Sequence, residues 1–162
     1  MKTQKMVRLA VLIALCGVGG FIKIPSPTGT VALDSLPGYL AGILLGGWGG
    51  AIVGALGHLF SAWTVSLPFG LPAHVYVAVQ MAIYVSIYGY LFRKGYKILA
   101  VIVAIILNGV VAAASFIPLY GAGFFAMMMP SLVVGSAVNI ILATLLMQST
   151  AIKKIAQGVE AK

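Results

Sequence analysis

The chain has 162 residues, of which 62% are hydrophobic and only 7% are charged, and its formal net charge is +8. Soluble domains carry roughly a quarter charged residues, and a soluble protein of this size has too little interior to bury so much apolar surface. The composition therefore excludes an ordinary soluble protein. It predicts a single compact domain, residues 1–162, embedded in the lipid bilayer.

The positive charge is concentrated beside apolar segments. Nine of the ten Lys and Arg residues form three clusters: Lys2, Lys5 and Arg8; Arg93, Lys94 and Lys97; and Lys153, Lys154 and Lys162. The positive-inside rule places such clusters at the cytoplasmic ends of membrane helices. Nucleic acid is not an expected partner, because no basic face is interleaved with exposed aromatic residues.

The first apolar segment, residues 6–24, is long enough to cross a hydrocarbon core of about 30 Å as a helix. It also resembles a signal peptide, with a passable cleavage site at residues 17–19. We expect it to be retained as the first membrane helix. After it, Pro25, Pro27 and Gly29 predict an irregular loop.

The next apolar stretch, from residue 35 to about residue 63, is too long for one helix unless it is strongly tilted. Its middle, GGWGG at residues 46–50, favours a turn because glycine weakens a helix. A turn there also brings all three basic clusters to one side of the membrane. We therefore predict two helices, at about 35–46 and 49–65.

The rest of the chain predicts three more spans, at about 73–92, 98–117 and 130–149. Loops rich in Pro and Gly precede the first and the last of them, including a loop around Pro118, Gly121 and Gly123. The predicted fold is thus an all-α bundle of six transmembrane helices. Both termini are expected in the cytoplasm and the Pro/Gly-rich loops outside.

Small residues recur at helical spacing in two places: Ala10 and Ala14, and the series Gly42, Gly46, Gly50 and Gly54. Such spacing lets helix backbones approach closely in lipid. The contact could lie within one subunit. Alternatively, Ala10 and Ala14 form a flat face for a partner protein.

The sequence offers little for catalysis. Asp34 and Glu160 are the only acidic residues, and Glu160 lies in the tail, so no carboxylate pair is expected in the membrane. His58 and His74 are too few and too far apart in the sequence to predict a metal site. Cys16 is the only cysteine and is expected to be a buried thiol. A phosphate-binding loop is absent, so the chain itself is predicted to be neither an ATPase nor another enzyme.

Hydrogen-bonding and aromatic side chains instead gather in the outer half or middle of the predicted bundle. Tyr76, Gln80 and Tyr84 share one helical face. Such a lining suits a mostly uncharged ligand with an aromatic part and several hydroxyl or amide groups. The candidate binding residues are Asp34, Tyr39, His58, Trp63, His74, Tyr76, Gln80, Tyr84, Asn108, Tyr120 and Asn139.

Structural roles are open for several of these residues. Trp63 could belong to the aromatic belt at the membrane interface. Asn108 and Asn139 could join helices through hydrogen bonds. His58 could end a packing seam that begins at Gly54, and Asp34 could be a helix N-cap.

The chain resembles the substrate-binding S components of energy-coupling-factor (ECF) vitamin transporters over nearly its whole length. The resemblance lies in the size, the six predicted helices, the Ala10 and Ala14 pair, and the long outer loops. It implies a multi-pass protein of the bacterial cell membrane, with Ala10 and Ala14 against a membrane scaffold, the T component. It also implies two cytoplasmic ATPase partners that use ATP, and no cofactor on this chain.

Two segments, ALDSLPGYLAG at 32–42 and PFGLPAHVYVAVQM at 68–81, resemble S components assigned to α-ribazole, a cobalamin precursor. The resemblance implies that Trp63, Tyr76 or Tyr84 stacks on the base. Groups expected to bond the ribose and the ring nitrogen are Asp34, His74, Gln80, Asn108 and Asn139. Alternatives are another vitamin, such as pantothenate or pyridoxine, a stand-alone transporter or channel, and a membrane enzyme or accessory subunit.

Overall fold

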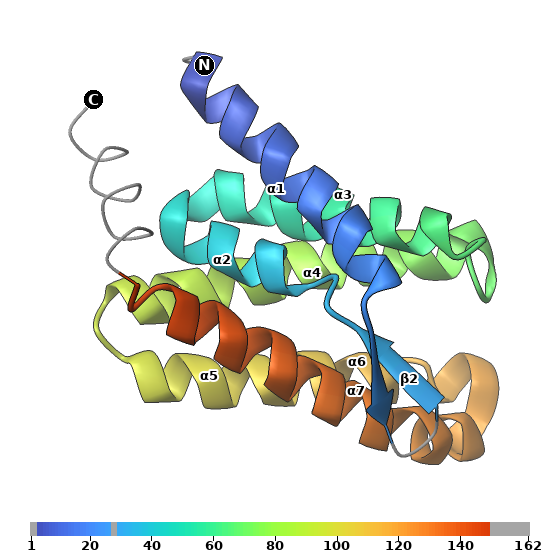
Figure 1. Ribbon diagram of the computed structural model, residues 1–162. Helices are drawn as coiled ribbons and strands as arrows, with labels where there is room; N and C mark the ends of the chain where they lie inside the picture. The colour runs from blue at the N-terminus through green and yellow to red at the C-terminus, as the bar shows by residue number, and fades with distance from the viewer. Residues whose placement is uncertain (1–2, 27–28, 150–162) are drawn as a thin grey trace.

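The computed structural model describes residues 3–26 and 29–149, and most of these residues are helical (Figure 1). A π-helix, η1 (Ile106–Val111), joins α5 to α6, so the described residues form six helical segments. The helices are α1 (Thr3–Phe21), α2 (Leu36–Leu44), α3 (Gly47–Thr64), α4 (Gly70–Arg93), α5 (Lys97–Ile105), α6 (Ala112–Ala114) and α7 (Ile117–Leu146).

The prediction of an irregular loop after the first helix is wrong, because a β-hairpin forms there. Strands β1 (Lys23–Ser26) and β2 (Gly29–Ala32) pair antiparallel, with Ile24 opposite Val31. Pro25 is tolerated because a two-stranded hairpin consists only of edge strands, where a missing N–H need not break a ladder bond. The hairpin lies across α7 (Figure 1). Val31 of the hairpin packs against Gly135 of α7.

The turn between α2 and α3 lies at the glycine-rich segment, as the sequence predicts. Helix α2 ends at Leu44, and α3 begins at Gly47. Gly46 and Gly47 adopt positive φ angles of 54° and 40°, which side chains strongly disfavour. The chain therefore reverses direction where glycine allows the required backbone angles at little cost in free energy.

The start of the last helix differs from the prediction. Residues 118–129 were expected to belong to an outer loop after the fifth span, yet α7 begins at Ile117. Pro118 lies in its first turn, where proline needs no hydrogen-bonded N–H, and Gly121 forms a kink with φ 80°. Pro130, expected near the start of this helix, lies inside it.

Three helical segments of the described chain are long and apolar enough to cross a membrane: Gly70–Arg93, Lys97–Ala114 and Ile117–Leu146. Helix α2 has 9 residues, a length of about 14 Å, and does not reach across the hydrocarbon core by itself. The hairpin and α2 together occupy the position of one outer loop and one span in the prediction.

The bundle has two different ends. The start of α1, the α2–α3 turn, the α4–α5 turn and the end of α7 lie towards one end, and the hairpin, the α3–α4 turn and the α6–α7 junction towards the other (Figure 1). Lys5, Arg8, Arg93, Lys94 and Lys97 belong to the first group of segments. The third basic cluster lies outside the described residues.

Glycines allow α2, α3 and α4 to meet backbone to backbone. A Cβ atom added at Gly50 would lie 2.8 Å from the Cα of Gly42, and one added at Gly54 would lie 2.8 Å from the carbonyl oxygen of Met81. A Cβ atom at Gly89 would collide with the carbonyl of Gly42. Gly42, Gly50 and Gly54 thus serve packing within this subunit.

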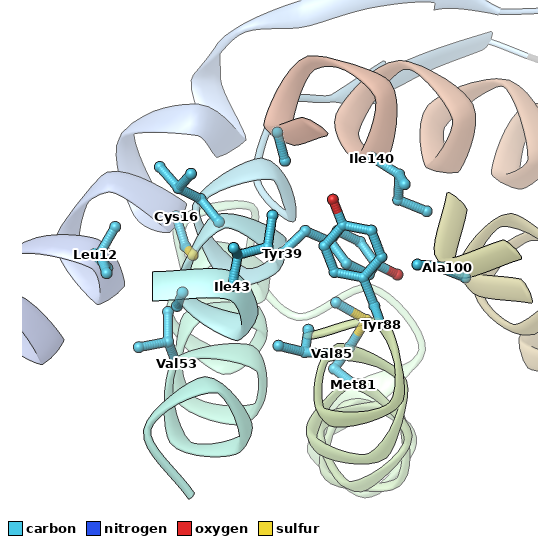
Figure 2. Close-up of a cluster of buried hydrophobic side chains, with 14 of the residues drawn as sticks. Leu12, Cys16, Tyr39, Ile43, Val53, Met81, Val85, Tyr88, Ala100 and Ile140 are labelled. Atoms are coloured by element: carbon cyan, nitrogen blue, oxygen red, sulfur yellow. The ribbon is translucent and has the colours of Figure 1, made fainter. Parts of the chain in front are cut away.

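Two buried tyrosines fill the centre of the packed region (Figure 2). The rings of Tyr39 and Tyr88 meet edge to face with centroids 5.2 Å apart, and both side chains are fully buried. The hydroxyl of Tyr88 bonds Thr144 on α7 at 2.8 Å. Tyr39, predicted to bind a ligand, packs in this core, and among the described residues its buried hydroxyl has no hydrogen-bond partner.

Candidate ligand-binding cavity

A cavity of about 220 Å³ lies between the helices on the side of the hairpin and the α3–α4 turn. Elements from α1 to α7 contribute to it, so it is enclosed by the bundle and not by one loop. Its lining consists of Cys16, Asp34, Ser35, Gly38, Gly54, His58, Phe69, Ala73, His74, Val77, Met81, Asn108, Ala112, Ala113, Phe116, Tyr120, Phe124, Met128 and Leu132.

One wall of the cavity is aromatic. Phe116, Tyr120 and Phe124 lie at the α6–α7 junction and on the first turns of α7, with neighbouring ring centroids 5.8 and 4.9 Å apart. Phe69 from the α3–α4 turn meets Phe124 edge to face at 5.4 Å. The backbone of Phe69 has φ 68°, which is strained for a bulky residue and often marks a functional site. These rings can stack on a flat ligand.

A carboxylate also contributes to the lining of the cavity. Asp34 lies in the loop between β2 and α2, and its Oδ2 accepts a hydrogen bond from Ser61 Oγ on α3 at 2.7 Å. Burial raises the pKa of the Asp34 carboxyl above its ordinary value, and bonds from Ser61 and the backbone N–H groups of Asp34 and Ser35 oppose that shift. The N-cap of α2 is Ser35, so Asp34 does not have the capping role considered for it.

The two histidines meet, although their separation in the sequence argued against a joint site. His58 Nε2 on α3 lies 3.2 Å from His74 Nδ1 on α4. The other ring nitrogen of His74 bonds the carbonyl oxygen of Pro68 in the α3–α4 turn. The pair links two helices and a turn at the edge of the cavity.

Asn108 reaches the cavity from η1. Its Nδ2 donates to Ser136 Oγ on α7 at 2.9 Å, so it also joins two helices as the sequence allowed. A π-helix inserts an extra residue into a helix and rotates the side chains that follow, and such segments are frequent at functional sites.

The predicted residues divide into two groups. Those that line the cavity are Asp34, His58, His74, Asn108 and Tyr120. On α4 the predicted face of Tyr76, Gln80 and Tyr84 is displaced by one position from the lining face, which is Ala73, Val77 and Met81. One residue along a helix is a rotation of about 100°.

The polar residues of the displaced face have other neighbours. Gln80 is buried and donates from Nε2 to Ser115 Oγ at 2.8 Å. Tyr76 packs its ring edge to face against Phe116, and so supports a cavity residue from behind. Tyr84 is buried, with 6% of its surface exposed. Gln80 and Tyr76 thus contact the region of Ser115 and Phe116, and a ligand-binding role for this face stays a prediction.

Asn139 and Trp63 also lie away from the cavity lining. Asn139 accepts from the N–H of Leu36 and donates to the carbonyl oxygens of Ala32 and Gly135, at 2.7, 2.8 and 2.8 Å. It therefore fixes the start of α2 and the end of β2 to α7. Trp63 is 71% exposed near the end of α3, which fits the alternative role in an interfacial belt.

Sequence reasoning missed most of the apolar lining, although a pattern for it exists. Phe116, Tyr120, Phe124, Met128 and Leu132 recur every four residues, the spacing of one helical face. The glycines and proline in this stretch suggested a loop and hid the periodicity. A four-residue aromatic series would have indicated a helix that faces a ligand or a core.

Ala10 and Ala14 lie on the outward face of α1. Both are exposed, and so are their neighbours Val7, Val11 and Val18. The opposite face of α1 packs against the bundle through Leu12 and Cys16, among others (Figure 2). Within the described residues, nothing covers the alanine pair.

The family model described as "ECF transporter, substrate-specific component" matches residues 4–149 of the chain. A comparison with curated protein sequences found no match. S components bind a substrate and work with a T component and ATPases. The chain therefore belongs to the substrate-specific components of ECF transporters, which makes it a multi-pass plasma-membrane transport subunit and not an enzyme.

Proposed function

We propose that this S component captures α-ribazole, or a closely related cobalamin precursor, for ATP-driven import by its partner subunits. The observation that carries the proposal is a cavity lined both by aromatic rings, including Phe116 and Phe124, and by the polar residues Asp34 and His58. A benzimidazole would stack on the rings, and ribose hydroxyls would bond the polar side chains.

The size of the cavity restricts the ligand. Drug-sized ligands occupy cavities of roughly 300–1,000 Å³, and this cavity measures about 220 Å³. A bicyclic ring system fits such a volume, with an attached sugar beside the polar side chains of Asp34 and His74. Large vitamins with several ring systems fit less well than a nucleoside-like molecule.

The proposed topology has six membrane segments and both termini in the cytoplasm. Support comes from Arg93, Lys94 and Lys97, which lie in the α4–α5 turn at the end away from the hairpin (Figure 1). The positive-inside rule assigns that end to the cytoplasm. The cavity, beside the hairpin and the α3–α4 turn, then faces the exterior.

Ala10 and Ala14 are proposed to contact the T component. Their small side chains leave a flat strip on exposed α1 where another helix can approach closely. Ala14→Trp should preserve ligand binding but abolish co-purification with the T component and ATPases, and with it uptake. Leu15→Trp, of equal bulk on the neighbouring face, is the matched control and should retain both. Concentrative uptake by the isolated chain would instead favour a stand-alone transporter.

The substrate is tested by binding to the purified protein. α-Ribazole, pantothenate and pyridoxine are compared by calorimetry, and mass spectrometry identifies any ligand that co-purifies. Tight binding of α-ribazole alone is expected. Tight binding of another vitamin without detectable binding of α-ribazole would overturn the substrate assignment and leave the family assignment in place.

A further inference from the structure

The hydrogen bonds that already exist around the cavity determine which polar groups remain for a ligand. Asp34 is the only carboxylate in the described part of the chain, and an ionised carboxylate can only accept hydrogen bonds. Ser61 supplies one bond to Oδ2 at 2.7 Å. The backbone N–H groups of Asp34 and Ser35 also bond this carboxylate. A carboxylate has about four acceptor positions, so about one remains for a ligand, and Asp34 lines the cavity.

The histidine pair has a defined direction. The carbonyl oxygen of Pro68 can only accept, so the Nε2 of His74 carries the hydrogen in that bond. When both rings are neutral, the Nδ1 of His74 is the acceptor, and His58 Nε2 donates to it across 3.2 Å. In that arrangement the Nδ1 of His58 is unprotonated, and no described residue donates a hydrogen bond to it. His58 thus offers a second acceptor beside the cavity.

Asn108 adds a third acceptor from another element. Its Nδ2 is engaged with Ser136 Oγ, and no described residue bonds its Oδ1. Among the described residues the lining contains no Lys or Arg, and Lys23 acts on Asp34 only from outside the lining, so an anionic ligand would contact no basic side chain of that lining. Burial raises the pKa of Asp34 despite the bonds from Ser61 and the backbone, so a further donor from a ligand would stabilise the charged carboxylate.

We propose that the cavity recognises an aromatic ligand by the hydrogen-bond donors on its polar edge. N–H or O–H groups of the ligand bond the acceptors of Asp34, His58 and Asn108, while its ring meets Phe116 and Phe124. Aromatic anions are rejected, because a ligand carboxylate would face the carboxylate of Asp34. This inference rests on the proposed function only in taking this cavity as the substrate site.

Two probes of matched size test whether the cavity prefers hydrogen-bond donors to acceptors. The test does not depend on the identity of the vitamin. Benzamidine, a cation at neutral pH, carries a planar donor group on a benzene ring, and benzoate, an anion, carries a planar acceptor group on the same ring, so the pair tests both the donor preference and the rejection of anions. Binding of each to the purified full chain in detergent is measured by saturation-transfer NMR titration. Benzamidine should bind about tenfold tighter than benzoate or better, since each mispaired buried group is costly.

Asp34→Asn removes the charge and keeps both the size of the side chain and an acceptor for Ser61. The preference for benzamidine should fall about tenfold in this variant. Trp63→Ala, outside the cavity, is the control and should retain the preference. Thermal unfolding shows whether each variant is folded. Equal binding of the two probes, binding of neither, or an unchanged preference in folded Asp34→Asn would overturn the inference.

A second arm separates this inference from the choice of substrate. O-methylation of the ribose hydroxyls of α-ribazole removes donors and keeps oxygen acceptors. The methyl ethers should bind about tenfold more weakly than α-ribazole or worse. Full binding of the ethers would contradict the donor rule while the substrate assignment stands. Failure of α-ribazole to bind would overturn the substrate assignment. Benzamidine and benzoate would still show whether the cavity prefers donors to acceptors.

Discussion

The two ends of the bundle use the same helices in opposite ways. At the basic end, α2 and α4 touch through the backbones of Gly42 and Gly89, and Tyr39 and Tyr88 fill the centre (Figure 2). At the hairpin end, α4 presents Ala73 and Val77 to a cavity. The helices are in close contact at the basic end and enclose the cavity at the hairpin end. Stability and binding should therefore respond to different residues of one helix.

The largest effect is expected where the backbones touch. Gly89→Ala places a methyl group against the carbonyl of Gly42, and the helices must separate, so we expect a loss of about 3 kcal/mol or more in the free energy of unfolding. Thermal unfolding in detergent measures it. The control is Gly123→Ala, where the added Cβ meets nothing within 4 Å. A Gly89→Ala protein as stable as this control would show that the packed end is not tightly constrained.

Two asparagines sharpen the comparison between stability and binding. Asn139→Ala leaves the Leu36 N–H and the Ala32 carbonyl without their bonds, at a cost of about 3 kcal/mol in stability. Asn108→Ala should change stability less and ligand affinity more, because Asn108 lines the cavity. Unfolding and binding are measured on both variants. The reverse order of effects would move the functional site from the cavity towards the hairpin.

Removing a ring from the aromatic wall should weaken ligand binding, and it should lower the free energy of unfolding less than the changes at Gly89 and Asn139. Phe124→Ala removes a ring from the cavity, and we expect about tenfold weaker ligand binding. Phe21→Ala, on the exposed surface of α1, is the matched control and should bind normally. Titration calorimetry compares the two. Equal affinity of Phe124→Ala and wild type would argue against ring stacking in this cavity.

The smallest effect is expected at Trp63. Its side chain is 71% exposed and lies outside the cavity lining, so Trp63→Ala should change ligand affinity by less than about twofold. A binding titration on membranes or purified protein is sufficient. A loss of tenfold or more would restore Trp63 as the residue that stacks on the base.

Composition and periodicity predicted the membrane class, the glycine turn after α2 and the helical bundle. Those features follow from local chemistry, because glycine at Gly46 and the apolar runs act within a few residues. The hairpin was missed because two closely spaced prolines, Pro25 and Pro27, suggest a loop, whereas the strands that contain Ile24 and Val31 pair with each other. The start of α7 was missed because Gly121 breaks the helical φ/ψ pattern for one residue only.

The lining of the cavity was harder to predict than the fold. The rotation of α4 depends on its neighbours, and a shift of one residue exchanges the face of Gln80 for the face of Val77. Gln80 on α4 donates a hydrogen bond to Ser115, and Asn139 on α7 donates one to the carbonyl oxygen of Ala32. Both partners are far away in the sequence. The meeting of His58 and His74 likewise depends on how α3 and α4 pack.

A structure of the purified protein with its bound ligand tests the central claim most directly. The account predicts ligand density inside the cavity, with a ring against Phe116 and Phe124 and a donor group within hydrogen-bonding distance of Asp34. Density beside Trp63 or on the outer surface of the hairpin, with the cavity closed by side chains, would contradict it.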